Sequence, residues 1–185
     1  MHSVPQGILN RVDSVLIVID VQEKFKPAIS RWDETVANIS KLIRGCKTLG
    51  VPIIATEQYP KGLGRTVPEI IELLESQPIE KITFSCFGEQ KFKQKLEALN
   101  RRQLIICGIE AHVCALNTAL DARAGGYEVH YVVDAISSRK QSDKDIAVER
   151  VKQSGTYLAA TEMVLFQLLK DAGNEKFKEI SRIVK

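Results

Sequence analysis

Cys114 combines a reactive side chain with a position at the end of a strand-like run in this chain of 185 residues. It lies five residues after Ile109, the last residue of the apolar run "RQLIICGI", and near the start of a helical pattern. A thiol at a helix N-terminus meets unpaired N–H groups, which lower its pKa and favour the nucleophilic thiolate. A buried structural cysteine is the other interpretation, because this residue type is common in cores. Position alone leaves both interpretations open.

Two charged residues stand where they could serve such a thiol. Asp20 ends the run "SVLIVID", and a carboxylate at the end of a buried strand is desolvated, so its pKa rises toward that of a working base. Capping of the next turn is the alternative role for Asp20. Lys81 lies in "IEKITF", where a partly buried ammonium could pair with Asp20 and favour the thiolate, although a solvated surface charge is the ordinary alternative. His112 is only two residues from Cys114 and would point to a different helix face, so we expect a neighbouring polar or cap residue.

Short β-rich runs alternate with amphipathic segments along the chain, which is typical of βαβ units and a parallel sheet. The expected strands are 14–20, 52–57, 79–84, 103–109 and 128–134, with a short sixth near 156–161. Helical spacing covers 33–49, 88–99, 112–124 and 161–171. The first and fourth runs are apolar on both alternations, as in central strands covered by helices on both faces. We therefore expect a single domain over 1–185, a Rossmann-like three-layer αβα sandwich with a doubly wound, mainly parallel six-stranded sheet.

The expected topology brings the candidate residues together. Ligands of open parallel sheets bind beyond the carboxyl ends of the strands, where the strand order reverses. In the order 3-2-1-4-5-6 the first and fourth strands are neighbours, so Asp20 and Cys114 would meet in one crevice. The long irregular segment 56–69, "TEQYPKGLGRTVPE", follows the second strand, and loops of this length are usually functional or mobile. We expect Glu57, Gln58 and Tyr59 to form part of the pocket wall.

Composition and charge exclude several classes of partner. The net charge of +3 comes from interspersed acidic and basic residues, which argues against nucleic-acid binding. The apolar runs are shorter than the roughly 20 residues that cross a bilayer. No signal-like apolar segment precedes the first strand, and the four cysteines, which lack CxxC spacing, fit a reducing compartment, so we expect a cytoplasmic protein. The three histidines are too dispersed to form a zinc site with the cysteines.

Three motifs carry a resemblance to a known family. The segments "LIVIDVQEKF" (16–25), "EKITFSCF" (80–87) and "CGIEAHVCALNTALDA" (107–122) resemble the isochorismatase-like cysteine hydrolase superfamily in order and spacing. Further similarity extends over nearly the whole chain and is greatest to the isochorismatase-domain-containing branch. The resemblance implies a triad in which Asp20 is the general base, Lys81 its cationic partner and Cys114 the nucleophile.

The resemblance also implies the surroundings of that triad. It implies a cis peptide bond between Ile109 and Glu110, with the backbone N–H groups of Glu110 and Cys114 forming an oxyanion hole. Phe25 and Ile109 complete the expected substrate-binding residues. The implied function is a metal-independent cysteine hydrolase that acts on a small amide or related acyl substrate through a thioester, with no cofactor, in a homo-oligomer.

The sequence departs from two branches of that superfamily. Nicotinamidases carry an Asp-x-His metal motif after the second strand, whereas this chain reads "TEQYPKGLG" and has no histidine between His2 and His112. A metal-bound pyridine site is therefore not expected. Isochorismate is a doubly anionic substrate, and only Lys61 and Arg65, in the long loop, could offer cations to it.

Two further readings of the chain belong to different classes of function. A catalytically idle member of the family could act as a scaffold, because a fold does not guarantee a function. A peroxide-sensitive thiol protein could use Cys114 with Cys107 or Cys86 as its resolving partner.

Overall fold

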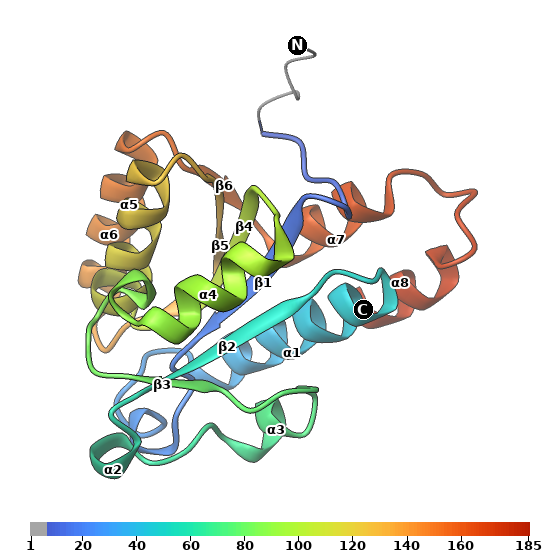
Figure 1. Ribbon diagram of the computed structural model, residues 1–185. Helices are drawn as coiled ribbons and strands as arrows, with labels where there is room; N and C mark the ends of the chain where they lie inside the picture. The colour runs from blue at the N-terminus through green and yellow to red at the C-terminus, as the bar shows by residue number, and fades with distance from the viewer. Residues whose placement is uncertain (1–6) are drawn as a thin grey trace.

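Six parallel strands form one sheet in the order β3-β2-β1-β4-β5-β6 (Figure 1), in a computed structural model that describes residues 7–185. The order and the parallel pairing confirm the expected doubly wound sheet. His2 lies outside the described residues. The strands are β1 (Ser14–Ile19), β2 (Ile53–Gln58), β3 (Ile79–Lys81), β4 (Gln103–Ile109), β5 (Glu128–Ser137) and β6 (Tyr157–Ala159).

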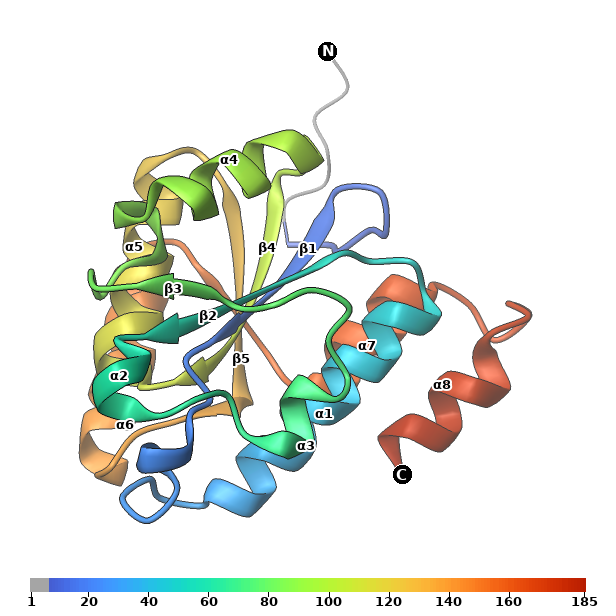
Figure 2. The same cartoon turned by 60° about the horizontal axis from the view of Figure 1, so that its bottom comes forward.

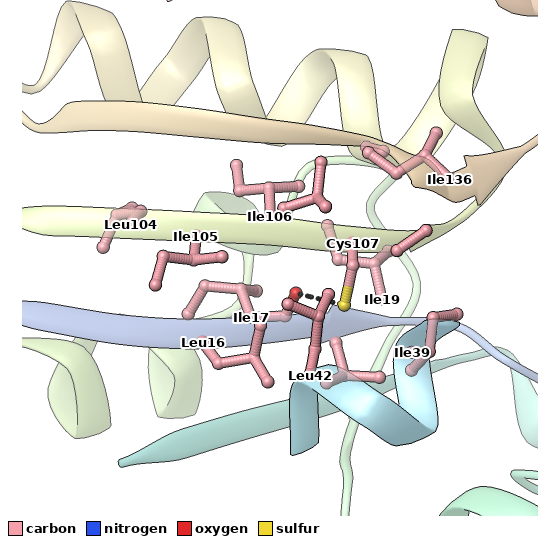
Figure 3. Packing of buried hydrophobic residues seen from close by; sticks show 14 of the residues in the cluster. Leu16, Ile17, Ile19, Ile39, Leu42, Leu104, Ile105, Ile106, Cys107 and Ile136 are labelled. Carbon is pink, nitrogen blue, oxygen red and sulfur yellow. Dashed lines mark hydrogen bonds between the residues drawn. The ribbon is translucent and has the colours of Figure 1, made fainter. Parts of the chain in front are cut away.

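The two central strands, β1 and β4, are buried along their whole length, as their two-sided apolar pattern predicts. They pair directly, with Ile17 opposite Ile106 and Val18 opposite Cys107. Their side chains form the middle of the hydrophobic core together with residues of the first long helix (Figure 3). The Cys107 thiol donates to the carbonyl of Ile17 at 3.6 Å, so this cysteine is part of the core.

Helices cover both faces of the sheet. The helices α1, α7 and α8 lie on one face, and α4, α5 and α6 lie on the other (Figures 1 and 2). Their bounds are α1 (Trp32–Thr48), α4 (Gln90–Leu99), α5 (Leu116–Ala124), α6 (Gln141–Gln153), α7 (Thr161–Leu169) and α8 (Phe177–Val184). Helix α1 buries Val36, Ile39, Ile43 and Cys46 against the sheet, which is the apolar face expected from helical spacing, and Gly50 follows its end with a φ of 71°.

Several boundaries differ from those expected. Strand β3 ends at Lys81 instead of residue 84, because the chain then turns so that the carbonyls of Thr83 and Phe84 accept hydrogen bonds from the Lys81 ammonium, each at 3.2 Å. Strand β5 continues to Ser137 instead of residue 134, since a register shift lets its end pair with the end of β4.

Other elements were not expected at all. Helices α6 and α8 were missed, because the apolar residues that they bury are few, such as Ala147 and Val151 in α6 and Ile180 in α8. The segment 56–69 is less irregular than predicted, since it holds α2 (Pro60–Leu63) and the start of α3 (Pro68–Ile71). Each of these two helices begins with a proline, which is favoured at the first helical position. No helix within residues 7–185 is both long and apolar enough to span a membrane.

Candidate active site

Asp20 lies directly after β1, at the carboxyl edge of the sheet, and its side chain is fully buried. Its φ of 52° turns the chain sharply there, and its backbone N–H donates to the carbonyl of Thr56 on β2 at 3.1 Å. The Thr56 hydroxyl donates to Asp20 Oδ1 at 2.7 Å. Neighbouring strands therefore fix the orientation of the carboxylate.

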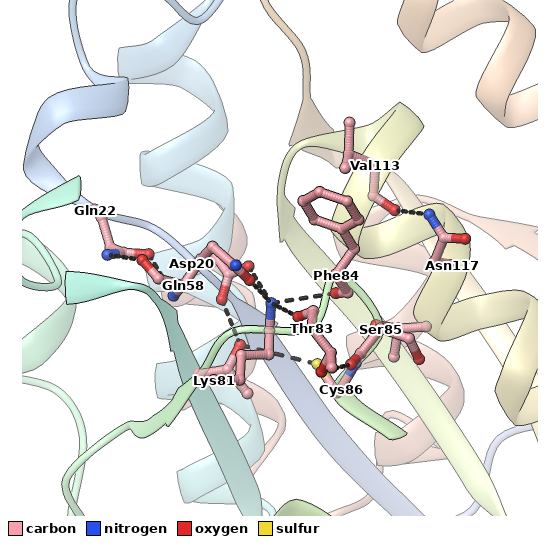
Figure 4. A network of polar contacts seen from close by, with 12 residues as sticks. Asp20, Gln22, Gln58, Lys81, Thr83, Phe84, Ser85, Cys86, Val113 and Asn117 are labelled. Carbon is pink, nitrogen blue, oxygen red and sulfur yellow. Dashed lines mark hydrogen bonds and ion pairs between the residues drawn. The ribbon is translucent and has the colours of Figure 1, made fainter. Parts of the chain in front are cut away.

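Lys81 supplies the charge that compensates Asp20 (Figure 4). Its Nζ atom lies 2.7 Å from Asp20 Oδ2 and 2.7 Å from Gln58 Oε1, and it also donates to the two carbonyls that follow β3. Burial alone would lower the pKa of Lys81, but the Asp20 carboxylate raises it, and the net pKa lies above its usual value. The lysine is therefore a buried, fully bonded cation and not the surface charge that an isolated lysine usually is.

Cys114 lies in a π-helical turn (Ala111–Ala115) between β4 and α5, and only 4% of its surface is exposed. Burial raises the pKa of this thiol, and the charge and hydrogen bond of the Asp20 carboxylate raise it further, whereas the Lys81 ammonium lowers it. The net pKa lies well above the ordinary value. The expectation that the helix N-terminus lowers the pKa of Cys114 is therefore wrong, because burial and the adjacent carboxylate raise this pKa by more than the helix end lowers it. The thiol is therefore the hydrogen-bond donor and the Asp20 carboxylate the acceptor.

The turn that carries Cys114 begins with a cis peptide bond between Ile109 and Glu110. The Glu110 carbonyl accepts hydrogen bonds from the N–H groups of Val113 at 3.1 Å and Ala115 at 3.2 Å. The buried Glu110 carboxylate is bonded to Arg139 through a backbone N–H at 3.2 Å and Nε at 3.0 Å. These contacts hold the turn against the segment that follows β5.

His112 lies beside this turn and is not placed against Asp20. Its Nδ1 atom is 2.9 Å from the hydroxyl of Ser138, and its Nε2 atom is 3.9 Å from Asp143 Oδ2. It thereby links the Cys114 turn to the end of β5 and to α6. This is the neighbouring polar role that the sequence indicates.

The expected pocket-wall residues divide into two groups. Glu57 contacts the following loop, because its carboxylate accepts from the N–H and hydroxyl of Thr66 at 2.6 and 2.7 Å and from Arg65 at 2.9 Å. Gln58 faces Lys81, and its amide nitrogen donates to the carbonyl of Ile82 at 2.6 Å. Both residues thus have structural partners that the sequence does not reveal.

The remaining expected binding residues differ in exposure. Tyr59 is half exposed, and its ring lies against Gly62 in α2. Phe25, at the end of the short 3-10 helix Glu23–Phe25, is partly buried against the core. Ile109 is completely buried at the end of β4. Of these three, Tyr59 has the most surface free for a ligand.

Sequence reasoning missed two residues that support the site, Thr56 and Gln22. Gln22 donates through Nε2 to the carbonyls of Gln58 at 2.9 Å and Gly64 at 2.7 Å, and its Oε1 accepts from the N–H of Gln58 at 2.8 Å. Both side chains are buried polar groups with specific partners. Their only sequence signal is a polar residue within or just after a buried strand.

The described residues, 7–185, contain no group of three or more His, Cys, Asp or Glu side chains arranged to hold a metal ion. Free cysteines are all buried. The site is thus composed of a buried carboxylate–ammonium pair beside a thiol.

Fold and site together define a doubly wound α/β protein with a candidate nucleophile at the carboxyl edge of its sheet. The family model of the isochorismatase domain matches residues 14–163, and the chain belongs to the isochorismatase family. The zebrafish protein named isochorismatase domain-containing protein 2 is 45% identical over 179 residues, which are 96% of this chain and 90% of that protein.

Solved structures show the same fold. A structure of MAR1 ribonuclease from Caenorhabditis elegans is 38% identical and superposes with a TM-score of 0.91, covering 96% of this chain and 92% of that one. YcaC from Pseudomonas aeruginosa, solved with hexane-2,5-diol and covalent acrylamide, is 25% identical with a TM-score of 0.89, covering 96% and 92% of the two chains. Membership of this family supports the general assignment of the protein as a hydrolase.

Proposed function

We propose that this protein is a metal-independent cysteine hydrolase that cleaves a small amide or a related acyl compound through a thioester on Cys114. The observation that carries the proposal is the buried arrangement of three groups: the Lys81 ammonium is 2.7 Å from the Asp20 carboxylate, and both groups shift the pKa of the Cys114 thiol. A nucleophile, a base and a group that orients the base are the parts that covalent catalysis requires.

In the first half of the proposed reaction, Asp20 accepts the proton from Cys114 Sγ as the sulfur attacks the substrate carbonyl carbon. The developing oxyanion accepts hydrogen bonds from the backbone N–H groups of Glu110 and Cys114. The carbon–nitrogen bond then breaks, the leaving nitrogen takes the proton from Asp20, and the acyl group remains on sulfur. Lys81 holds the base in place throughout.

In the second half, water gives a proton to Asp20 and attacks the thioester carbonyl. The carbon–sulfur bond breaks, sulfur recovers the proton, and the carboxylic acid leaves. A resting thiol with a raised pKa suits this cycle, because the proton moves to Asp20 only when the substrate carbonyl is present to accept the sulfur electrons. The cycle needs no metal and no cofactor.

The comparison with YcaC supports a nucleophile in this fold. Acrylamide is an electrophile, and its covalent attachment to that protein requires a nucleophilic group there. We transfer this reactivity to Cys114. Asp20 and Lys81 also shift the pKa of Cys86, but Cys86 is completely buried, whereas 4% of the surface of Cys114 is exposed.

A second candidate function comes from the similarity to MAR1 ribonuclease. Incubation of the protein with a labelled single-stranded RNA would detect this activity. Loss of RNA cleavage in Cys114→Ala would assign it to the same site, whereas cleavage that survives this substitution would point to a contaminant or to another site.

The proposed hydrolase is tested by trapping its acyl-enzyme. The wild-type protein is incubated with a panel of small primary amides, ammonia release is measured, and the quenched protein is examined by intact mass spectrometry and peptide mapping. We expect an acyl mass on Cys114 and ammonia release that Cys114→Ala abolishes. The matched control is Cys107→Ala, which changes a core cysteine bonded to the carbonyl of Ile17.

Other results of these experiments would contradict the hydrolase proposal or favour one of the alternatives. An acyl group on another residue, or ammonia release unchanged in Cys114→Ala, would overturn the proposal. A disulfide between Cys114 and either Cys86 or Cys107 after mild peroxide treatment, without hydrolysis of any amide, would favour the redox-sensitive thiol. If the protein shows neither amide hydrolysis nor disulfide formation, the result would favour a scaffold function.

We also propose that the protein is a homo-oligomer, which sedimentation velocity would establish, since a monomer sediments as a 20.7 kDa species.

A further inference from the structure

Exposed apolar side chains are concentrated beside Lys81. Of the seven large hydrophobic residues strongly exposed within residues 7–185, three are Tyr59, Ile82 and Phe84. The N–H of Tyr59 donates to the Lys81 carbonyl at 2.9 Å, and Ile82 accepts from Gln58. The carbonyl of Phe84 accepts from Lys81 Nζ at 3.2 Å. These three residues, here called the apolar rim, therefore lie next to the end of β3, the strand that carries Lys81.

Phe84, a member of the apolar rim, lies toward the turn that carries Cys114. Its ring points toward Val113, the residue before Cys114 (Figure 4). Val113 is itself only partly buried, and 59% of the surface of Phe84 is exposed. A phenyl ring held near a nucleophile with more than half of its surface open is free to cover a bound ligand.

The cations around the site are already paired. The ammonium of Lys81 already donates to the Asp20 carboxylate, the Gln58 side-chain oxygen and two backbone carbonyls. Arg65 lies 2.9 Å from Glu57 and 2.6 Å from Glu80. An anionic substrate would have to break one of these pairs to gain a bonded cation.

Two further cations, Arg139 and Lys61, add little that could bind an anionic substrate. Arg139 is 3.0 Å from the buried Glu110 carboxylate. Lys61, on the exposed helix α2, forms no ion pair with any residue in the range 7–185, but a single solvated ammonium contributes little to binding.

We infer that the acyl part of the substrate is uncharged and apolar, and that Phe84 is a specificity-determining residue that contacts it. The inference rests on the proposed function and narrows it from any small amide to amides with a hydrocarbon acyl group. A carboxylate placed against the apolar rim would lose its hydration without gaining a partner, whereas each buried methylene group adds to binding.

The test compares two amides of similar shape. The probes are 4-methylpentanamide, with a branched hydrocarbon end, and succinamate, in which a carboxylate occupies that place. We expect kcat/KM of the wild-type protein to favour 4-methylpentanamide by about 30-fold or more, since loss of complementary contacts in a pocket costs about 10- to 200-fold. Equal rates or a preference for succinamate would overturn the inference while leaving the hydrolase proposal intact.

Substitutions of Phe84 test whether this residue causes the preference for the hydrocarbon acyl group. Phe84→Ser should lower kcat/KM for 4-methylpentanamide by about 10-fold and leave that for succinamate unchanged, and Phe84→Leu should restore most of the loss. The control Ile146→Ser changes a similarly exposed apolar residue on α6 and should change neither value. An equal loss for both amides in Phe84→Ser would mean that Phe84 acts on the whole site and not on specificity.

Alkylation of Cys114, which needs no hydrolysis, separates the inference about the acyl group from the proposed hydrolase function. Neutral iodoacetamide should alkylate Cys114 faster than anionic iodoacetate by a ratio larger than that of a free cysteine peptide, and Phe84→Ser should move this ratio toward the peptide value. A ratio equal to that of the peptide would overturn the inference even if no amide were hydrolysed. Absence of both hydrolysis and Cys114 alkylation would overturn the proposed function and the inference with it.

Discussion

The ammonium nitrogen of Lys81 lies 2.7 Å from Oδ2 of Asp20, and both side chains are fully excluded from solvent. The other carboxylate oxygen of Asp20 accepts from the Thr56 hydroxyl at 2.7 Å. A buried ion pair with satisfied hydrogen bonds is costly to break from one side, because the remaining charge has no partner and no water. This relationship makes the pair a structural element of the protein as well as part of the proposed catalytic site.

Substitution of Lys81 by Met should therefore lower the free energy of unfolding by about 3–5 kcal/mol, since it leaves the Asp20 carboxylate buried and unpaired. The double change Asp20→Asn with Lys81→Met should cost less than the sum of the two single changes. Urea unfolding of all four proteins measures this coupling. Lys152→Met, which removes an exposed lysine 3.9 Å from Glu149, is the control and should cost less than about 1 kcal/mol. Additive costs would contradict the coupling.

Gly108 should not tolerate a side chain. Its φ is 121°, and a Cβ atom there would collide with the backbone oxygen and nitrogen of Ile19 on the adjacent strand. Gly108→Ala should therefore lower the free energy of unfolding by about 3 kcal/mol or more, or prevent folding. Gly126→Ala is the matched control, because its φ of 79° is also positive but no atom lies within 4 Å of the added Cβ. It should cost only about 1 kcal/mol, and equal costs would show that the close approach to Ile19 is unimportant.

Glu57 should hold the loop that follows α2. Its carboxylate accepts two hydrogen bonds from Thr66, so Glu57→Ala, which removes the acceptor, should reduce the protection of the Thr66 amide against hydrogen exchange, by about 10-fold if one net hydrogen bond of 1–1.5 kcal/mol is lost. Glu80→Ala is the control, since Glu80 is exposed and its carboxylate contacts Arg65 alone among the described residues. Unchanged protection in Glu57→Ala would assign the order of this loop to other contacts.

Buried thiols should make the protein less stable at alkaline pH. Burial raises the pKa of Cys46 from 9.0 to about 12, so the folded state keeps a proton that the unfolded state releases. The stability from this group is complete below pH 9 and falls as the pH rises toward 12, by about 1.4 kcal/mol per pH unit. Urea unfolding between pH 9 and 10.5 should show a shallower pH dependence for Cys46→Ala than for the wild-type protein. Equal slopes would contradict this assignment.

The sheet could be predicted from the sequence because its central strands carry an unambiguous signal. The runs that became β1 and β4 are apolar on both faces and only 6 and 7 residues long, which is typical of strands covered on two sides. Helix α6 could not be predicted in the same way, because it buries only Ala147 and Val151, while Ile146 is exposed and Val148 only partly buried. The end of β3 was also misplaced, since the turn after Lys81 depends on bonds from a buried ammonium that no local pattern encodes.

The candidate site was predictable in its residues but not in its electrostatics. Strand-end positions and the family motifs singled out Asp20, Lys81 and Cys114, and the structure brings these three together. The direction of the Cys114 pKa shift was predicted wrongly, because it depends on burial and on the distance to Asp20. The partners of Glu57 were likewise hidden, because alternation along β2 places it on the face opposite Thr56 and Gln58.

The most direct test of the catalytic unit is the pH dependence of Cys114 alkylation by iodoacetamide in the wild-type protein, Asp20→Asn and Lys81→Met. Because the Asp20 carboxylate raises the pKa of the thiol and the Lys81 ammonium lowers it, we expect Asp20→Asn to move the alkylation profile to lower pH and Lys81→Met to move it to higher pH. Asp20→Asn should nevertheless lose hydrolysis, since its base is gone. Profiles that do not move, or that move in the same direction in both variants, would contradict the coupling of these three residues.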